Sequence, residues 1–215
     1  EKDIPVYGNP FDTVDLIVAS WHYVRGRKGY EPELFKAKPF DLVVIDEAHA
    51  ARITRTQFGS ARPTRLHELA MALSALTPHI FLVTATPLQL NELEALDLLR
   101  ILGLGGPWVH EDEFTRFYRA LSQSPSERDE DGWLHLFALI SWFAKIYLKP
   151  EQIDAVVKAF FEEKSPELVQ ELVDILSSEN VDAFRGFLRR LDPAKRDGLD
   201  RVLRGLAPVS WFMIR

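Results

Sequence analysis

The fold of this 215-residue chain is decided by the stretch Asp41-Leu42-Val43-Val44-Ile45-Asp46-Glu47-Ala48-His49. Its apolar run is continuous rather than alternating, which is typical of a strand covered on both faces of a parallel sheet. Residues 80–83 have the same character, and residues 14–19 also have the composition of a strand. These three runs predict a parallel α/β sheet in the first half of the chain.

Helical patterns lie between these strands. Thr64 can cap a helix that runs to about residue 76, with leucines repeating along one face. A second helix is predicted over residues 91–102. Strands that alternate with helices favour a parallel sandwich of three layers.

The sequence changes character near residues 103–107, after which almost every segment has helical periodicity. The apolar spacing predicts helices over 153–161, 165–176, 184–191 and 199–206. Residues 133–148 are predicted to form a buried core helix, because a membrane span needs roughly 20 apolar residues. Residues 122–132 are polar and acidic, so we expect a loop or a disordered segment. The domain prediction is a sheet region (1–103), a helical insertion (104–208) and a return strand (209–215).

Composition and charge set only broad limits. The chain has 47% hydrophobic and 27% charged residues, which is ordinary for a globular protein. Its net charge of −6 argues against a protein that coats nucleic acid, although a motor can grip nucleic acid locally and still be acidic. The absence of cysteine excludes disulfides and cysteine-ligated zinc. No signal peptide or membrane span is recognisable, so we expect an intracellular chain.

Two adjacent carboxylates follow the strand at residues 41–45. Ligands of an open parallel sheet bind at the carboxyl ends of its strands, where Asp46 and Glu47 are expected. An aspartate at this edge can hold Mg²⁺, and a glutamate next to it can orient and deprotonate a water molecule. That division of labour suits hydrolysis of a nucleoside triphosphate. The alternative is an ordinary acidic strand-to-helix turn in which Asp46 caps the helix.

Two hydroxyls flank a small residue after the next predicted strand, in Thr84-Ala85-Thr86-Pro87. Such hydroxyls can bond to a carboxylate or to His49 and relay a change between two sites. A plain Thr-Pro turn is the simpler explanation when this segment is considered alone.

Taken together, residues 46–49 and 84–89 resemble motifs II and III of superfamily-two helicases and translocases. The continuation through Gln89 is similar to the Swi/Snf-type branch, which includes chromatin-remodelling and RNA-polymerase-recycling ATPases. That branch typically reads T-G-T-P-L-Q-N-N-L-E-E-L. Here Ala85 replaces the glycine, Leu90 replaces an asparagine, and one residue is inserted.

The resemblance implies a partial RecA-like lobe, the first of two in a parent protein that hydrolyses ATP with Mg²⁺ and translocates on duplex DNA. In that protein Asp46 would hold Mg²⁺ and Glu47 would activate the attacking water. The residues expected to bind the nucleotide or couple it to nucleic acid are His49, Thr84, Thr86 and Gln89. The helical insertion falls where this family carries a protrusion, and it is a possible site for a protein partner.

Candidate nucleic-acid contacts follow the same edge of the sheet. Residues 17–22 resemble the family's upstream motif that touches nucleic acid, with Ser20 and Trp21 at its turn. The chain segments that leave this edge of the sheet carry basic residues, which include Arg25, Arg52 and Arg55. A second basic cluster, which we expect to be a solvated face, consists of Arg189, Arg190, Lys195, Arg196, Arg201 and Arg204.

The chain contains no G-x-x-x-x-G-K-S/T phosphate loop. In the resembling family this loop lies upstream of the Asp-Glu-Ala-His motif, and the arginine fingers lie in the second lobe. We therefore expect that the 215 residues alone neither bind nor hydrolyse ATP.

Two other functions remain compatible with the sequence. The chain is also consistent with the motor of an RNA helicase, or of a restriction or phage-defence complex. The other function is that of a non-catalytic module whose helical half docks onto other proteins.

Overall fold

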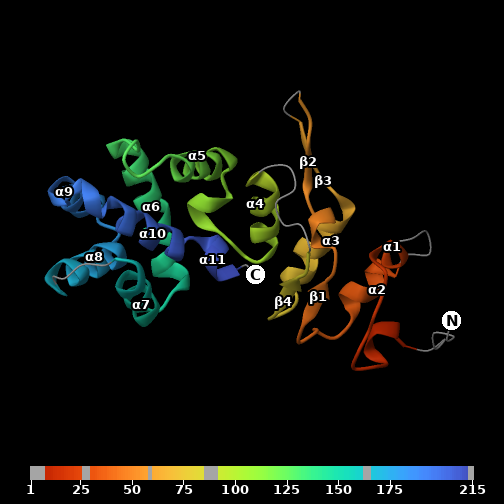
Figure 1. Cartoon of the computed structure of the whole chain (residues 1–215). Helices are drawn as coiled ribbons and strands as arrows, with labels where there is room; N and C mark the ends of the chain where they lie inside the picture. The colour runs from red at the N-terminus through yellow and green to blue at the C-terminus, as the bar shows by residue number, and fades with distance from the viewer. Residues whose placement is uncertain (1–7, 26–29, 58–59, 85–91, 162–165, 213–215) are drawn as a thin grey trace. The chain divides into compact units, whose positions relative to one another are not determined.

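The computed structural model describes residues 8–25, 30–57, 60–84, 92–161 and 166–212 (Figure 1). The chain divides into two compact units, Glu1–Pro87 and Leu88–Arg215. Within the described ranges, strands occur in the first unit only, and most other residues are helical. The predicted fold class, an α/β region with a small parallel sheet followed by a mostly helical region, is confirmed.

The sheet of the first unit pairs strands β1 (Val43–Ile45) and β4 (Ile80–Leu82) in parallel, as predicted. Ile45 lies opposite Leu82, and the backbone N–H of Val83 donates to the carbonyl of Ile45 at 2.8 Å. Helix α3 (Arg65–Ser74) lies between these strands in the sequence and contacts β1. Its N-cap Thr64 accepts a hydrogen bond from the backbone N–H of His67, which confirms the predicted cap.

Only one face of this small sheet is covered by described residues. On the covered side, Ile45 is 9% exposed, and α3 buries Leu66, Leu69 and Leu73. Alternate residues of a strand point to opposite faces. The residues of the other face are exposed: Leu42 (47%), Val44 (55%), Phe81 (56%) and Val83 (48%). The prediction of strands covered on both faces is therefore not met within the described part of the chain.

Residues 14–19, predicted as a strand, form no strand in the structure. Val14, Leu16 and Val18 are 58%, 82% and 93% exposed. A strand needs neighbours that pair with its backbone and cover a face, and apolar composition alone does not supply them. The flanking elements are short helical turns: η1 (Pro10–Asp12), α1 (Trp21–Val24) and α2 (Glu31–Lys36).

An antiparallel hairpin that the sequence analysis did not predict follows the turn η2 (Ala48–Ala50). It pairs β2 (Ile53–Arg55) with β3 (Ala61–Pro63). The backbone N–H of Thr56 donates to the carbonyl of Ser60 at 2.9 Å, which extends the pairing beyond β2. Figure 1 shows the hairpin projecting away from β1 and β4.

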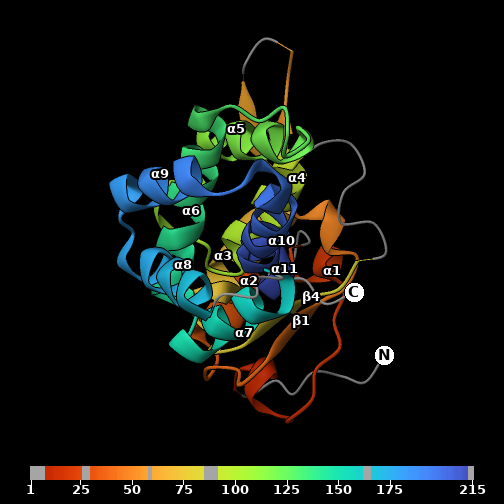
Figure 2. The same ribbon diagram turned by 60° about the vertical axis from the view of Figure 1, so that its left-hand side comes forward.

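The second unit is a helical bundle built around α6 (Glu130–Tyr147). Figures 1 and 2 show α6 in the middle of this unit, and it contacts α5, α8, α9 and α10. The other elements of the unit are α4 (Glu92–Ile101), η3 (Gly106–Val109), α5 (Glu111–Ser122), α7 (Pro150–Phe160), α8 (Pro166–Ser178), α9 (Val181–Arg190), η4 (Pro193–Lys195), α10 (Arg196–Leu206) and α11 (Pro208–Phe212). The helices predicted by apolar spacing are confirmed.

Aromatic side chains fill the centre of this bundle. Trp133, Phe137 and Phe143 of α6 are at most 1% exposed, so they form core and not an external surface. The Phe137 ring stacks on Phe184 with centroids 4.2 Å apart, and the buried Trp108 Nε1 donates to a backbone carbonyl of α6 at 2.9 Å. The predicted buried helix over 133–148 is thus confirmed, and no helix in the described part of the chain is long and apolar enough to cross a membrane.

Two expectations about segment boundaries are corrected. Residues 209–212, expected to begin a return strand, belong to helix α11. Proline fits the first turn of a helix, and Pro208 begins α11, while Trp211 Nε1 donates to the Gly205 carbonyl at 3.0 Å. In addition, α4 contacts α5 and α11, so it belongs to the helical unit although the domain prediction assigned residues 1–103 to the sheet region.

Candidate functional site

The Asp-Glu-Ala-His segment forms a sharp turn immediately after β1. Asp46 and Glu47 are both exposed, and Asp46 Oδ1 accepts the backbone N–H of Glu47 at 2.9 Å. Glu47 has φ 51° and ψ 42°, a left-handed conformation that is uncommon for a residue with a side chain. Such backbone strain clusters at functional sites, and here it turns the chain from β1 directly into η2.

His49 joins this turn to the end of the neighbouring strand. Its Nδ1 lies 3.1 Å from Glu47 Oε2 and 3.4 Å from Thr84 Oγ1. The backbone N–H of Ala48 donates to the carbonyl of Val83 at 2.9 Å, which holds the two strand ends together. The predicted residues Glu47, His49 and Thr84 therefore meet at one edge of the sheet.

The two contacts of His49 share its Nδ1. A protonated Nδ1 can donate to the Glu47 carboxylate or to the Thr84 hydroxyl, whereas an unprotonated Nδ1 can only accept from the Thr84 hydroxyl. Which nitrogen carries the proton is therefore linked to whether Glu47 is held by His49.

The donor set at this edge suits a weakly held divalent cation. Among the described residues, no group of three or more acidic or histidine side chains is placed to hold a metal ion. Mg²⁺ does not require such a cage, because it usually keeps several waters and binds one or two carboxylates together with substrate phosphates. The exposed carboxylate of Asp46 fits this mode of binding. The other predicted nucleotide residues, Thr86 and Gln89, lie outside the described residues.

The upstream candidates are partly engaged within the protein. Ser20 is the N-cap of α1, and its carbonyl accepts the backbone N–H of Tyr23 at 2.9 Å. The Trp21 ring lies 3.6 Å from the ring of His22, measured between centroids. Arg25 forms ion pairs with Glu31 at 3.2 Å and Glu68 at 3.3 Å, and its side chain is 15% exposed. Arg25 therefore ties α1 to α2 and α3, and a role in binding nucleic acid stays a prediction.

The downstream candidates lie on the unpredicted hairpin. Arg52 precedes β2 and Arg55 ends it, and both are half-buried. Arg55 Nη1 donates to the carbonyl of Ile53 at 3.0 Å. Arg62, in the middle of β3, is exposed and lies opposite Thr54 in the register.

Three arginines of the second basic cluster pair with acidic neighbours. Arg189 Nη2 lies 2.9 Å from Glu130, and Arg190 pairs with Glu171. Arg204 Nε lies 2.6 Å from Asp200 Oδ2 within α10.

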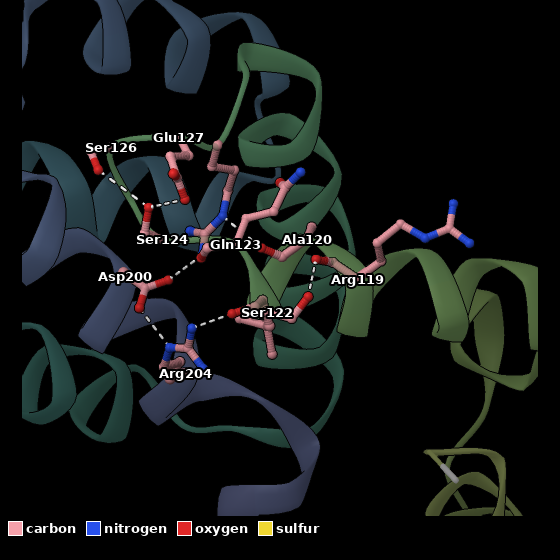
Figure 3. Close-up of polar contacts among 11 residues, drawn as sticks. Arg119, Ala120, Ser122, Gln123, Ser124, Ser126, Glu127, Asp200 and Arg204 are labelled. Carbon is pink, nitrogen blue, oxygen red and sulfur yellow. Dashed lines mark hydrogen bonds and ion pairs between the residues drawn. The ribbon is translucent and has the colours of Figure 1, made fainter.

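A buried ion pair between the α5–α6 loop and α10 was not anticipated from the sequence. The Arg128 side chain is fully buried, and its Nη2 lies 2.7 Å from Asp200 Oδ1. Arg128 Nε also donates to the Ala120 carbonyl at 2.8 Å, and its guanidinium lies 4.3 Å from the centre of the Trp133 ring. Figure 3 shows Asp200 paired with Arg204 beside the loop that carries Ser124 and Glu127. Residues 123–129 thus form an ordered loop with a buried charge, whereas Ser122 ends α5 and residues 130–132 begin α6, so the predicted loop over 122–132 was too long.

This pair is held mainly by charge. Within the described part of the chain, neither Arg128 Nη1 nor Asp200 Oδ1 has a hydrogen-bond partner, so the 2.7 Å contact is an ion pair without good hydrogen-bond alignment. Burial lowers the pKa of the Arg128 guanidinium, and its interaction with Asp200 opposes that shift. Its position, away from the Glu47 turn in the sequence and within the helical unit, indicates a structural role.

Comparisons with known proteins reveal partial similarity to a group of bacterial proteins. Among the relatives are RNA polymerase-associated proteins RapA from Vibrio vulnificus strains YJ016 and CMCP6 and from Vibrio parahaemolyticus serotype O3:K6 strain RIMD 2210633. Each is 35% identical to this chain over 95 residues, which is 44% of the chain and 9% of the relative. No protein-family model and no solved structure matches the chain. The chain thus corresponds to a small part of much longer relatives.

Proposed function

We propose that this chain is part of the first motor lobe of a helicase-like, nucleic-acid-dependent ATPase of the Swi/Snf-type branch of superfamily two. The observation that carries the proposal is the meeting of Glu47, His49 and Thr84 at the carboxyl ends of two parallel strands. The partial similarity to the RapA proteins supports the same superfamily. Because the chain spans 9% of those relatives, the catalytic unit is proposed to be a longer polypeptide that contains these residues.

In this proposal each residue of the turn has a separate task. Asp46 holds the Mg²⁺ that accompanies ATP, and that ion neutralises charge on the transferred phosphoryl group. Glu47 orients the attacking water and accepts its proton. His49 holds or releases the Glu47 carboxylate according to its contact with Thr84. Nucleic acid that moves β4 would thereby change the rate of hydrolysis.

The test is ATP hydrolysis by the longer polypeptide, with and without duplex DNA. Glu47→Gln keeps the shape of the side chain but removes its basicity, so kcat should fall by about 10²-fold or more. The KM for ATP should change little, because binding does not use the lost proton acceptor. The matched control is Glu151→Gln, which changes an exposed carboxylate in the first turn of α7 and should leave kcat unchanged. A Glu47→Gln protein with the unmodified rate would refute the proposed role.

The proposed nucleic acid is duplex DNA, and replacing it with single-stranded RNA in the same assay tests this choice. Stronger stimulation by RNA would instead favour an RNA helicase. Motors of restriction or phage-defence complexes remain a proposal of the same class, and stimulation by DNA does not separate them. Each of these functions would place the protein inside the cell.

Association with RNA polymerase is a second candidate function. It is favoured by the name of the RapA relatives, which are described as RNA polymerase-associated. The helical unit has its own aromatic core and offers a stable platform for such a partner. Co-purification of the chain with isolated RNA polymerase, without nucleic acid, would support this function, and its absence at micromolar concentrations would count against it.

A further inference from the structure

The hairpin formed by β2 and β3 carries concentrated positive charge. Residues 48–67 contain four arginines and no aspartate or glutamate, in a chain whose net charge is −6. The four are Arg52, Arg55, Arg62 and Arg65. A basic segment within an acidic chain is the electrostatic pattern of a local contact with an anionic partner.

The hairpin contributes little to the core of its unit. All three residues of β3, Ala61, Arg62 and Pro63, are exposed, and β2 is at most half-buried. An isolated two-stranded hairpin is only marginally stable in water, so packing does not explain its presence.

The base of the hairpin and the described ends of its two strands are nevertheless well held. At the base, the Thr64 backbone N–H donates to the Arg52 carbonyl at 2.9 Å, and the Thr64 hydroxyl donates to the Ala50 carbonyl at 2.9 Å. Near the tip, the hydroxyls of Thr56 and Ser60 lie 2.7 Å apart. The described strands of the arm are therefore held together before any partner binds, which reduces the entropy lost on binding.

We propose that this hairpin binds the phosphodiester backbone of a nucleic-acid duplex through Arg55 on one face of the ribbon and Arg62 on the other. The choice of nucleic acid among anionic partners rests on the proposed function. The major groove of DNA, about 12 Å wide, admits a two-stranded ribbon, and arginine and threonine are frequent partners of phosphate oxygens. Arg62 lies directly opposite Thr54, so a guanidinium and a hydroxyl are presented together. The contact is expected to be independent of base sequence.

The position of the hairpin gives this contact a consequence for the nucleotide site. Only η2 separates Glu47 from the residues that lead into β2. The Thr64 hydroxyl bonds to Ala50 at the end of η2, so the base of the hairpin is fastened to the same turn that carries His49. A duplex bound to the arm would therefore act on the turn that positions Glu47.

The experiment measures binding of the 215-residue chain to a fluorescein-labelled 25-base-pair duplex by anisotropy at several salt concentrations. Each lost phosphate contact reduces the slope of log K against log salt by about 0.9. The double variant Arg55→Gln with Arg62→Gln should therefore reduce the slope by about 1.8 and weaken binding at low salt. The single variant Arg62→Gln, which changes an exposed side chain, should reduce it by about 0.9, whereas Arg62→Lys should preserve most of the slope.

The matched control is Arg116→Gln with Arg119→Gln, which removes two exposed arginines from α5 in the helical unit and changes the net charge equally. The control should keep the slope of the unmodified chain. If hairpin and control variants have the same slope, or if the unmodified chain does not bind the duplex, the inference is wrong. Competition by polyglutamate as effective as that by unlabelled duplex would also overturn it, because the arm would then recognise acidic polypeptide. Circular dichroism checks folding, and the single Arg62→Gln variant decides the matter if the double variant is unfolded.

Failure here can be distinguished from failure of the proposed function. The binding measurement requires neither ATP nor Glu47. If the hairpin variants of the longer polypeptide keep duplex-stimulated ATPase activity, the proposed function stands and the proposed binding of duplex by the hairpin is refuted. If the polypeptide binds duplex through the hairpin but lacks ATPase activity, the hairpin contact is supported and the proposed function is refuted.

Discussion

Replacing Asp200 by alanine is predicted to destabilise the helical unit strongly, because it leaves the buried Arg128 without its counter-charge. The side chains of Arg128 and Asp200 are 0% and 9% exposed. Removing one partner of a buried ion pair typically costs about 3–5 kcal/mol. Arg128 keeps its hydrogen bonds to the carbonyls of Ala120 and Gln123, so we expect the lower end, about 3 kcal/mol.

Urea unfolding monitored by tryptophan fluorescence measures this loss. Four of the five tryptophans, at positions 108, 133, 142 and 211, belong to the unit Leu88–Arg215, so the signal reports mainly on the helical bundle. The predicted change is a lower midpoint with an unchanged m-value, because the same surface is exposed on unfolding.

The control for this prediction is Asp131→Ala. Asp131 pairs with Arg116 at 2.7 Å, but its side chain is 78% exposed, so its loss should cost about 1 kcal/mol or less. The double variant Arg128→Met with Asp200→Leu removes both buried charges and should lose less stability than Asp200→Ala alone. The reasoning fails if Asp200→Ala costs no more than Asp131→Ala.

Three further predictions concern the helical unit. Gly106→Ala should destabilise the helical unit by about 2 kcal/mol or more, because Gly106 has φ 62° and a Cβ would lie 2.0 Å from Trp142. The control is Gly186→Ala, where a Cβ would meet open space. It should stabilise α9 by up to about 1 kcal/mol in the same urea assay. Burial raises the pKa of Tyr118 to about 12, so its stabilising contribution is complete below pH 10 and is lost as the pH rises toward 12; Tyr118→Phe should flatten this decline in stability measured against pH. Burial lowers the pKa of His135 below the ordinary histidine value. Its contribution to stability is therefore complete above the ordinary pKa and is lost as the pH falls through the lowered pKa. An NMR titration that gives His135 an ordinary or raised pKa would contradict this.

The helical half was largely predictable because its signal is local. Apolar residues repeat along single helices, and proline or asparagine marks several starts, as at Pro150 and Asn180. The strands β1 and β4 were also recognisable from their continuous apolar runs. The runs at 14–19 and 209–212 were misassigned, because a short apolar segment does not by itself distinguish a strand from a helix or an unpaired chain. In the second case, Pro208 was a usable signal for a helix start.

The candidate site was predictable in its composition but not in its full geometry. The resemblance pointed to Glu47, His49 and Thr84, and the structure brings these three together. The hairpin was missed because Thr54, Thr56, Ser60 and the arginines give no apolar alternation, and its pairing depends on backbone hydrogen bonds. The Arg128–Asp200 pair joins distant parts of the sequence, so periodicity carries no trace of it.

The uncovered face of the small sheet has a practical consequence for anyone who prepares this chain. Within the residues that the structure describes, Leu42, Val44, Phe81 and Val83 are exposed apolar side chains in or next to two paired strands, and such surfaces promote self-association at high concentration. Solubility is therefore expected to respond to substitutions there rather than in the helical bundle. Changing Val44 to threonine keeps the β-branched shape, adds a hydroxyl and should raise the concentration at which the chain precipitates.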